Sequence, residues 1–196
     1  MTAAPRALTV LVVVTGAIGL VASIVLLIET FALLAEPTAA AWCDVNPFVG
    51  CSTSIGSAQG SLLGLPNPVL GIVFWTGALT VGLAMASGFR PKRWFAIGFL
   101  AAVTGAFALV VWFIVQSVFV IGVLCPWCML TWAATIPLFL AVLLQSLSSS
   151  TLPSSPAIRR ASGVLMEWIP LLTLAAYVAV AMVAQARLNL LSLLVR

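Results

Sequence analysis

The sequence contains no histidine, and only 6% of its 196 residues are charged. The missing imidazole excludes the commonest proton shuttle and metal ligand of proteins. The scarcity of charge excludes a soluble domain of this size, because 63% of the residues are hydrophobic and a small globular protein cannot bury so much apolar surface. The few basic residues are scattered, which argues against a nucleic-acid-binding surface. The composition, with a mean hydropathy of +1.26, therefore indicates a membrane protein.

Five runs of predominantly apolar residues meet or nearly meet the requirement of about 20 residues for a membrane span. Backbone polarity forces isolated spans to be helical. We expect helices at about 7–35, 68–86, 94–123, 126–147 and 164–186. The first run is too long for the apolar region of a signal peptide, so we expect it to be a permanent anchor. The prediction is an all-α integral membrane protein.

The positions of Lys and Arg predict the orientation of these helices. Six of the eight fall on one side of the predicted membrane: Arg6, Arg90, Lys92, Arg93, Arg159 and Arg160. Arg187 and Arg196 fall on the other side. The N-terminus is therefore predicted to be cytoplasmic, with the loop 36–67 and the turn 124–127 outside. Residues 148–163 form a predicted cytoplasmic linker, and residues 164–196 the fifth helix and a short tail.

This topology brings all four cysteines to the same outer face: Cys43, Cys51, Cys125 and Cys128. That compartment permits disulfides, whereas the cytosol keeps thiols reduced. The second pair forms the motif C-P-W-C at a helix start, where the proline suits the first helical position. The positive end of the helix dipole favours a thiolate there, which predicts a redox-active pair. The loop pair would then collect electrons and deliver them to C-P-W-C.

Two other interpretations of the cysteines remain open on the residues alone. Four thiolates are a suitable ligand set for zinc. Alternatively, the pairs are static disulfides that staple the outer loops. The chain would then be a metal-binding or structural membrane protein rather than an enzyme.

Four residues near the outer ends of the second and fourth helices are candidates for lining a ligand pocket. Asn67 precedes a proline and either caps the second helix or contacts a ligand. Gly71 and Phe74 share its helical face, where they either form a space with a flat wall or pack against another helix. Trp132, one turn after Cys128, lines a pocket or belongs to the interfacial aromatic belt.

The order and spacing of these features resemble the vitamin K epoxide reductase family, particularly its bacterial members. The resemblance rests on the Cys-x7-Cys loop pair, the serine-rich segment after it, Asn67 at the start of the second helix and C-P-W-C at the start of the fourth. It covers roughly residues 7–147. It implies a catalytic domain over 1–147, built as a four-helix bundle around a quinone, with a short half-helix of the outer loop 36–67 as a lid. The fifth transmembrane helix is an addition to that bundle.

The resemblance also implies roles for the cysteines. Cys43 would meet the thiol of a partner protein, and Cys51 would attack the membrane-face disulfide at Cys125. Cys128 would face the quinone. The chain would reoxidise a separate extracytoplasmic thioredoxin-fold thiol oxidase (DsbA-like), reduce menaquinone or ubiquinone without any metal, and so support disulfide formation.

Further quinone contacts follow from the same resemblance. Ser57 matches a position whose hydroxyl approaches the quinone oxygen, and Asn67 matches an amide that donates a hydrogen bond to it. Phe74 and Trp132 complete the expected quinone site. Where vertebrate members have a tyrosine, four residues after the last cysteine, this chain has Trp132, so quinone choice and activity on the epoxide are not implied.

Overall fold

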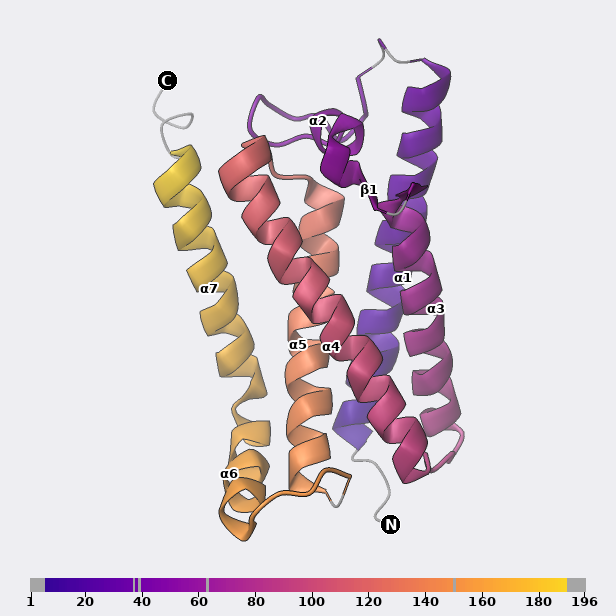
Figure 1. Cartoon of the computed structure of the whole chain (residues 1–196), viewed down its shortest axis with the longest axis vertical. Helices are drawn as coiled ribbons and strands as arrows, with labels where there is room; N and C mark the ends of the chain where they lie inside the picture. The colour runs from indigo at the N-terminus through magenta and orange to yellow at the C-terminus, as the bar shows by residue number, and fades with distance from the viewer. Residues whose placement is uncertain (1–5, 37, 39, 63, 150, 190–196) are drawn as a thin grey trace.

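The computed structural model describes residues 6–36, 38, 40–62, 64–149 and 151–189. Among these residues, five helices are long and apolar enough to cross a membrane. They are α1 (Arg6–Ala35), α3 (Asn67–Ala86), α4 (Arg93–Val115) continued by the π-helical η2 (Gln116–Ile121), α5 (Pro126–Ser148) and α7 (Ile169–Leu188). The predicted all-helical membrane architecture with five long helices is thus confirmed (Figure 1).

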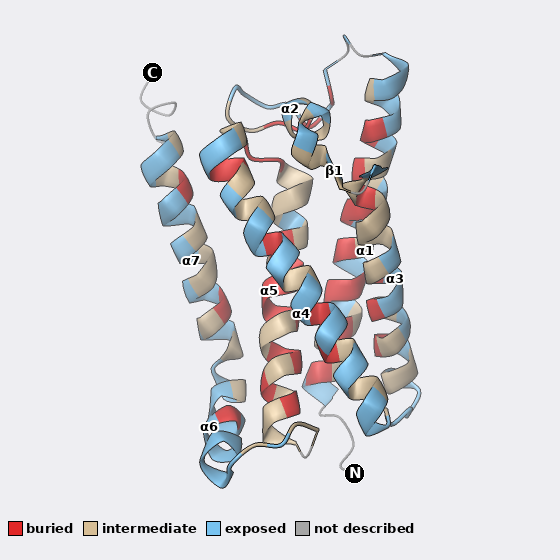
Figure 2. Ribbon diagram, viewed as in Figure 1, coloured by how far each residue is buried: buried red, intermediate tan, exposed pale blue. Residues whose placement is uncertain are grey.

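Helix α5 is the centre of the bundle, packed against α1, α4 and α7, while α1 packs most extensively against α3. The central helices are the most buried (Figure 2). In the 18-residue apolar stretch of each helix, 44% of the residues are buried in α5 and 39% in α1, against 11% in α7. Helices α1, α3, α4 and α5 therefore form the core bundle, and α7 lies at its edge.

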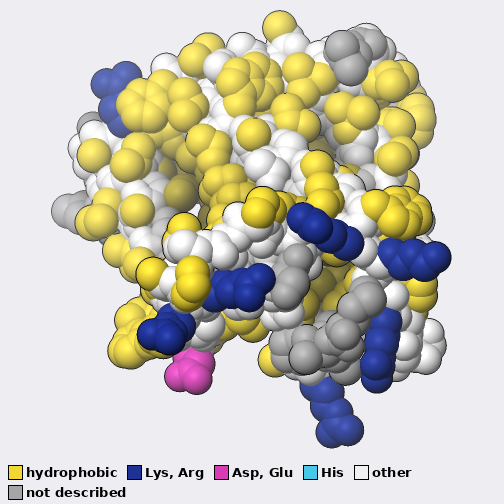
Figure 3. Space-filling view, turned by 60° about the horizontal axis from the view of Figure 1, so that its bottom comes forward, with side chains coloured by type: hydrophobic (Ala, Val, Ile, Leu, Met, Phe, Trp, Pro, Cys, Tyr) yellow, Lys and Arg dark blue, Asp and Glu magenta, His cyan; other side chains and the backbone are white. Residues whose placement is uncertain are grey.

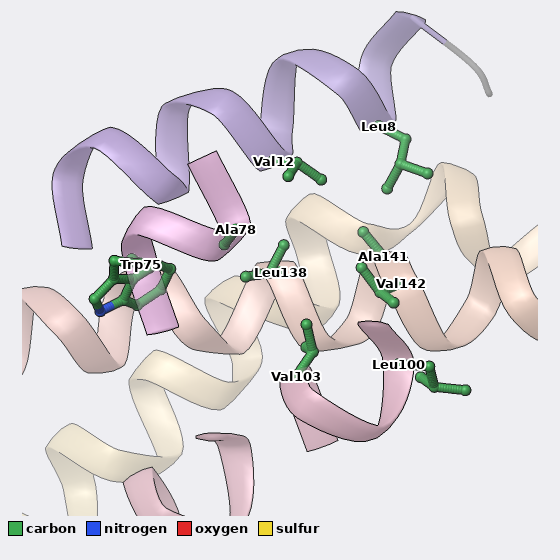
Figure 4. Packing of buried hydrophobic residues seen from close by; sticks show 10 residues of the cluster. Leu8, Val12, Trp75, Ala78, Leu100, Val103, Leu138, Ala141 and Val142 are labelled. Atoms are coloured by element: carbon green, nitrogen blue, oxygen red, sulfur yellow. The ribbon is translucent and has the colours of Figure 1, made fainter. Parts of the chain in front are cut away.

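The contact between α1 and α3 depends on glycines that let the two helices approach closely. A Cβ on Gly19 would lie 2.1 Å from the Trp75 ring, and a Cβ on Gly16 would lie 3.0 Å from the backbone of Leu79. Trp75 belongs to a buried cluster that joins all four helices of the bundle (Figure 4). The members of this cluster are Leu8, Val12, Trp75, Ala78, Leu100, Val103, Ala134, Leu138, Ala141 and Val142.

Two elements differ from the sequence-based expectation. The third span was expected to be helical to residue 123, but it ends in η2 and then turns at Gly122, whose φ of 74° suits a residue without a side chain. The expected linker over 148–163 contains the start of a further helix, α6 (Pro156–Glu167), capped by the Ser155 hydroxyl, which accepts a hydrogen bond from the Ile158 N–H. As a result, α7 begins at Ile169, five residues later than expected.

The segment between α1 and α3, called the outer loop after its predicted side of the membrane, folds over one end of the bundle (Figure 1). It contains the short helix α2 (Ser52–Gly56), the turn η1 (Ala58–Gly60) and a small antiparallel hairpin of β1 (Ser61–Leu62) and β2 (Leu65–Pro66). The start of α5 lies at the same end, whereas the start of α1, the α3–α4 connection and α6 lie at the opposite end. All four cysteines therefore belong to one end of the molecule.

Candidate functional site: two cysteine pairs and a cavity

The loop cysteines form a disulfide. Cys43 and Cys51 are bonded, with their Cα atoms 5.8 Å apart, and both are buried. The intervening turn is organised by Asn46, whose side-chain oxygen accepts hydrogen bonds of 2.9 Å from the N–H groups of Phe48 and Val49. The local sequence thus returns the chain on itself and brings the two sulfurs together.

Asp44 ties this loop into a single unit. One carboxylate oxygen accepts hydrogen bonds from the Cys51 and Ser52 N–H groups, at 2.6 and 3.1 Å. The other accepts from the Ala41 N–H, at 3.1 Å, and from the Ser52 hydroxyl. Desolvation acts to raise the pKa of Asp44, but the hydrogen bonds from Ser52, Cys51 and Ala41 outweigh it and hold that pKa below its ordinary value.

The sequence alone gives no role to Asp44, because its partners lie up to eight residues away and are set by the fold of the loop. Gly50 is required for the same arrangement. A Cβ at that position would lie 2.6 Å from an Asp44 carboxylate oxygen. The only signal in the sequence is an acidic residue eight positions before Ser52, the first residue of the short helix α2.

The second pair stands at the start of α5 with two free thiols. Cys125 is the N-cap, with extended backbone, and Pro126 is the first helical residue, as the motif predicted. Cys125 is fully buried, and Cys128 is partly buried in the first turn. The aromatic residue of the motif, Trp127, packs against Trp42 of the outer loop in a T-shaped arrangement, with 5.5 Å between ring centroids.

The two pairs meet at Cys51 and Cys125, whose sulfur atoms lie 3.5 Å apart. Backbone hydrogen bonds fix this approach: the Gly50 N–H donates to the Leu124 carbonyl at 3.1 Å, and the Leu124 N–H donates to the Phe48 carbonyl at 2.9 Å. The outer loop is therefore fastened to the residue that precedes Cys125.

The surroundings of Cys125 favour its thiolate. The hydrogen bond from the Cys128 thiol lowers the pKa of Cys125, burial opposes this, and the N–H dipoles of Cys128 and Trp127 add to the lowering. Asp44 works weakly against it. The net direction is downward, which makes Cys125 a good leaving group in thiol–disulfide exchange.

A cavity of about 160 Å³ lies between the outer loop and the bundle. An apolar cavity of roughly 150 Å³ is known to hold a benzene ring, so this space suits a flat aromatic group. Of the four cysteines, Cys128 lines it. The walls are mainly apolar and aromatic, and the aromatic lining residues are Phe74, Trp75, Phe113 and Trp132.

All four residues predicted to contact a quinone line this cavity: Ser57, Asn67, Phe74 and Trp132. Trp132 is buried, as expected for a pocket residue rather than a lipid-exposed one. The Ser57 hydroxyl donates to the Ser54 carbonyl at 2.7 Å.

Asn67 does not act as a helix cap, because α3 starts at Asn67 itself and Pro66 is the N-cap. Its side chain instead holds the outer loop. The side-chain oxygen accepts from the Leu62 N–H at 3.0 Å, and the side-chain nitrogen donates to the Gln59 carbonyl. Gly71 also serves helix packing, since a Cβ there would lie 2.5 Å from the Ser23 hydroxyl oxygen of α1.

Sequence reasoning missed several polar residues of the cavity. Ser54 lines it with a buried hydroxyl that has no hydrogen-bond partner among the described residues. Gln59 also lines it and donates to the Gln116 side chain of η2 at 3.3 Å, linking the loop to the π-helical turn. The irregular turn was invisible in the hydropathy pattern, although π-helical turns are frequent at functional sites.

The arrangement bears on the two other interpretations of the cysteines. The zinc interpretation needs four thiolates, but two sulfurs are bonded to each other. No group of three or more potential metal ligands occurs within the described part of the chain. A loop staple alone does not explain a free thiol of lowered pKa held against the disulfide.

Comparison with known proteins agrees with this geometry. The model of the vitamin K epoxide reductase family matches residues 10–143, a range that includes all four cysteines and all the described residues that line the cavity. A search of curated proteins found no match. Members of this family are quinone-dependent thiol–disulfide oxidoreductases. With a family match over most of its length, a disulfide in contact with a second thiol pair and an aromatic cavity beside Cys128, the chain belongs to the vitamin K epoxide reductase family.

Proposed function

We propose that this enzyme reoxidises a separate extracytoplasmic protein of thioredoxin fold and passes the electrons to menaquinone or ubiquinone, thereby supporting disulfide formation outside the cytoplasm. The catalytic unit is residues 1–147, and residues 148–163 connect it to the added helix within 164–196.

The orientation rests on the distribution of positive charge. Six basic residues belong to the end of the molecule opposite the cysteines: Arg6, Arg90, Lys92, Arg93, Arg159 and Arg160. Arg187 belongs to the cysteine end, and Arg196 lies outside the described residues. The N-terminus is then cytoplasmic, and the cysteine end faces the compartment in which disulfides persist.

Electrons enter through the loop disulfide. A thiolate of the partner protein attacks Cys43, and a second partner thiol resolves the mixed disulfide, so that the partner is oxidised and Cys43 and Cys51 become thiols. Cys51 then attacks Cys125 within a Cys125–Cys128 disulfide and releases the Cys128 thiolate. Cys43 next attacks Cys51, which restores the loop disulfide and releases Cys125.

The pair at the start of α5 delivers the electrons. Oxidation of Cys125 and Cys128 back to a disulfide passes two electrons and two protons to the quinone, which leaves as quinol. Cys128 contacts the quinone, because it lines the cavity. The disulfide at Cys43–Cys51 and the free thiols at Cys125 and Cys128 correspond to the stage just before the quinone is reduced.

Polar groups of the cavity stabilise the charge that grows on the quinone oxygen. Asn67 carries a second N–H on its side-chain nitrogen besides the one given to the Gln59 carbonyl. The Ser54 hydroxyl has no protein partner among the described residues and is a second donor. Ser57 supports the same wall, while Phe74 and Trp132 face the ring.

The observation that supports this function most strongly is the 3.5 Å approach of the Cys51 and Cys125 sulfurs beside a cavity lined by Cys128. The test is anaerobic mixing of the purified protein with reduced thioredoxin-fold donor and either menaquinone or ubiquinone, with quinol followed by absorbance. We expect quinol to form with at least one quinone and to vanish with Cys128→Ser. Quinol formation by Cys128→Ser at the rate of the unaltered protein would refute the proposal.

A further inference from the structure

A second, larger cavity opens at the end of the bundle opposite the cysteines. Its volume is about 680 Å³. It lies among the first turns of α1, the end of α3, the α3–α4 connection, the start of α4 and the end of α5. None of the residues assigned to thiol or quinone chemistry lines it. The proposed thiol and quinone chemistry therefore does not account for this cavity.

The rim of this cavity is strongly basic. Arg90, Lys92 and Arg93 line it, and no acidic residue is among the lining residues within the described ranges. Figure 3 shows that most of the visible Lys and Arg side chains gather at this end of the molecule. Arg93 is held in place, since its Nε donates to the Thr151 carbonyl at 3.0 Å, which uses one of the five N–H donors of the guanidinium.

Two further features favour an anion at the rim. Helix α4 starts here without a side-chain cap and without an acidic residue in its first turn, so its N–H groups and positive dipole end face the same region. Hydroxyl and amide side chains from the end of α5 and the segment after it complete the polar part of the lining: Gln145, Ser146, Ser148, Ser149 and Thr151.

The remaining walls are apolar. Apart from Pro91 in the α3–α4 connection, they come from α1, α3, α4 and α5 and consist of Leu8, Val12, Val81, Met85, Phe95, Ala96, Phe99 and Val142. A small soluble anion would satisfy the basic rim but leave these walls without a partner. An occupant that matches both parts is an amphiphile with an anionic head and a hydrocarbon portion.

We propose that this cavity binds an anionic phospholipid, with the head-group phosphate at Arg90, Lys92 and Arg93 and the upper part of the acyl chains against the apolar walls. The cations lie where the α3 and α4 spans end, which is the level of the lipid head groups. Basic cavities between membrane helices are a known means of binding such lipids.

The test uses the full-length protein in detergent, with phosphatidylglycerol or phosphatidylcholine of identical acyl chains added, and counts the lipids retained by native mass spectrometry. We expect selective retention of phosphatidylglycerol. The variant Arg90→Gln/Lys92→Gln/Arg93→Gln should weaken that retention roughly a hundredfold, about fivefold for each cation. Equal retention of the two lipids by the unaltered protein would overturn the proposal.

Two further variants and one competing ligand test whether the lipid binds in this cavity. The variant Arg6→Gln/Arg159→Gln/Arg160→Gln removes the same charge from the same end but from residues that do not line the cavity, and it should retain the lipid. An equal loss in that variant would mean unspecific attraction and would refute the site. Ala96→Trp keeps every cation but fills the apolar part, and it should also reduce retention. Displacement of the lipid by an equal concentration of glycerol phosphate would show a phosphate site instead and would overturn the lipid assignment.

Discussion

The sulfur of Cys51 lies 3.5 Å from the sulfur of Cys125, although the two residues are 74 positions apart in the sequence. No rearrangement of the helices is needed to exchange a disulfide between them. The loop already rests on the start of α5 through the Gly50 and Leu124 backbone bonds. This geometry supports the proposed role of Cys51 and Cys125 as the point of transfer between the two pairs.

Loss of Cys51 should separate two kinds of electron donor. In Cys51→Ser the loop pair no longer exists, so a thioredoxin-fold donor should fail to drive quinone reduction. A small dithiol such as dithiothreitol should instead reduce Cys125–Cys128 directly and still support quinone reduction. The measurement is the initial rate of quinol formation with each donor. A parallel loss with both donors would be inconsistent with the relay order.

The lowered pKa of Cys125 should be visible in a thiolate titration. With the Cys43–Cys51 disulfide intact, only Cys125 and Cys128 titrate, and the chain has four cysteines in total. We expect the first ultraviolet thiolate step below the ordinary range of a thiol, because a lowered pKa populates the anion at lower pH. In Cys128→Ala the leading hydrogen bond is lost and the step should move up. A first step that stays unchanged in this variant would contradict the assigned cause.

Asp44 should control the stability of the outer loop. Asp44→Asn replaces one acceptor oxygen by a donor that faces an N–H group, and we expect a loss of about 1 kcal/mol in the free energy of unfolding. The loop disulfide should also become more accessible to glutathione, as measured by the rate of its reduction. Gly50→Ala displaces the same carboxylate and should have a similar effect.

The pH dependence of the Asp44 contacts has a definite sign. Because the folded pKa is lowered, the stabilisation is complete above the ordinary carboxyl value of about 4 and is lost as pH falls through the lowered pKa. Resistance of the loop disulfide to a phosphine reductant, which acts in acid, should therefore be constant from neutral to about pH 5 and fall below about pH 4. A decline that begins near neutral pH would rule out Asp44 as its cause.

Gly19 should be intolerant of a side chain because α1 meets Trp75 there. Gly19→Ala places a methyl group into the indole ring, and the overpacking should cost about 1–3 kcal/mol in unfolding free energy. Since Trp75 lines the cavity, the KM for quinone should rise as well. Gly98→Ala is the matched control in α4, where a Cβ meets nothing within 4 Å, and it should be neutral or slightly stabilising. Equal changes in unfolding free energy in the two variants would show that the α1–α3 contact is looser than described.

Much of the fold followed from the sequence, because long apolar runs and C-P-W-C are local signals. The bounds of α3 and α5 agree with expectation to within one residue, and Pro126 opens α5 as predicted. The resemblance to a known family supplied the candidates Ser57 and Asn67, which local patterns alone left ambiguous, and both line the cavity.

The remainder depends on contacts between distant segments. The role of Asp44 is set by N–H groups that only the folded loop brings to it. The hydrogen bond between Gln59 and Gln116 joins residues that are 57 positions apart. Gln116 begins a π-helical turn, whose mainly apolar sequence is that expected of an ordinary helix. Helix α6 was missed because its serine-rich start indicates a linker and its apolar residues cover only one face.

The central claim, direct exchange between Cys51 and Cys125, is tested most directly by a double variant that retains only these two cysteines. In Cys43→Ser/Cys128→Ser, mild oxidation followed by peptide mapping should find an intramolecular Cys51–Cys125 disulfide in nearly all molecules, at a rate independent of protein concentration. Free thiols, or bonds only between separate molecules, would show that the two sulfurs do not meet and would contradict the account.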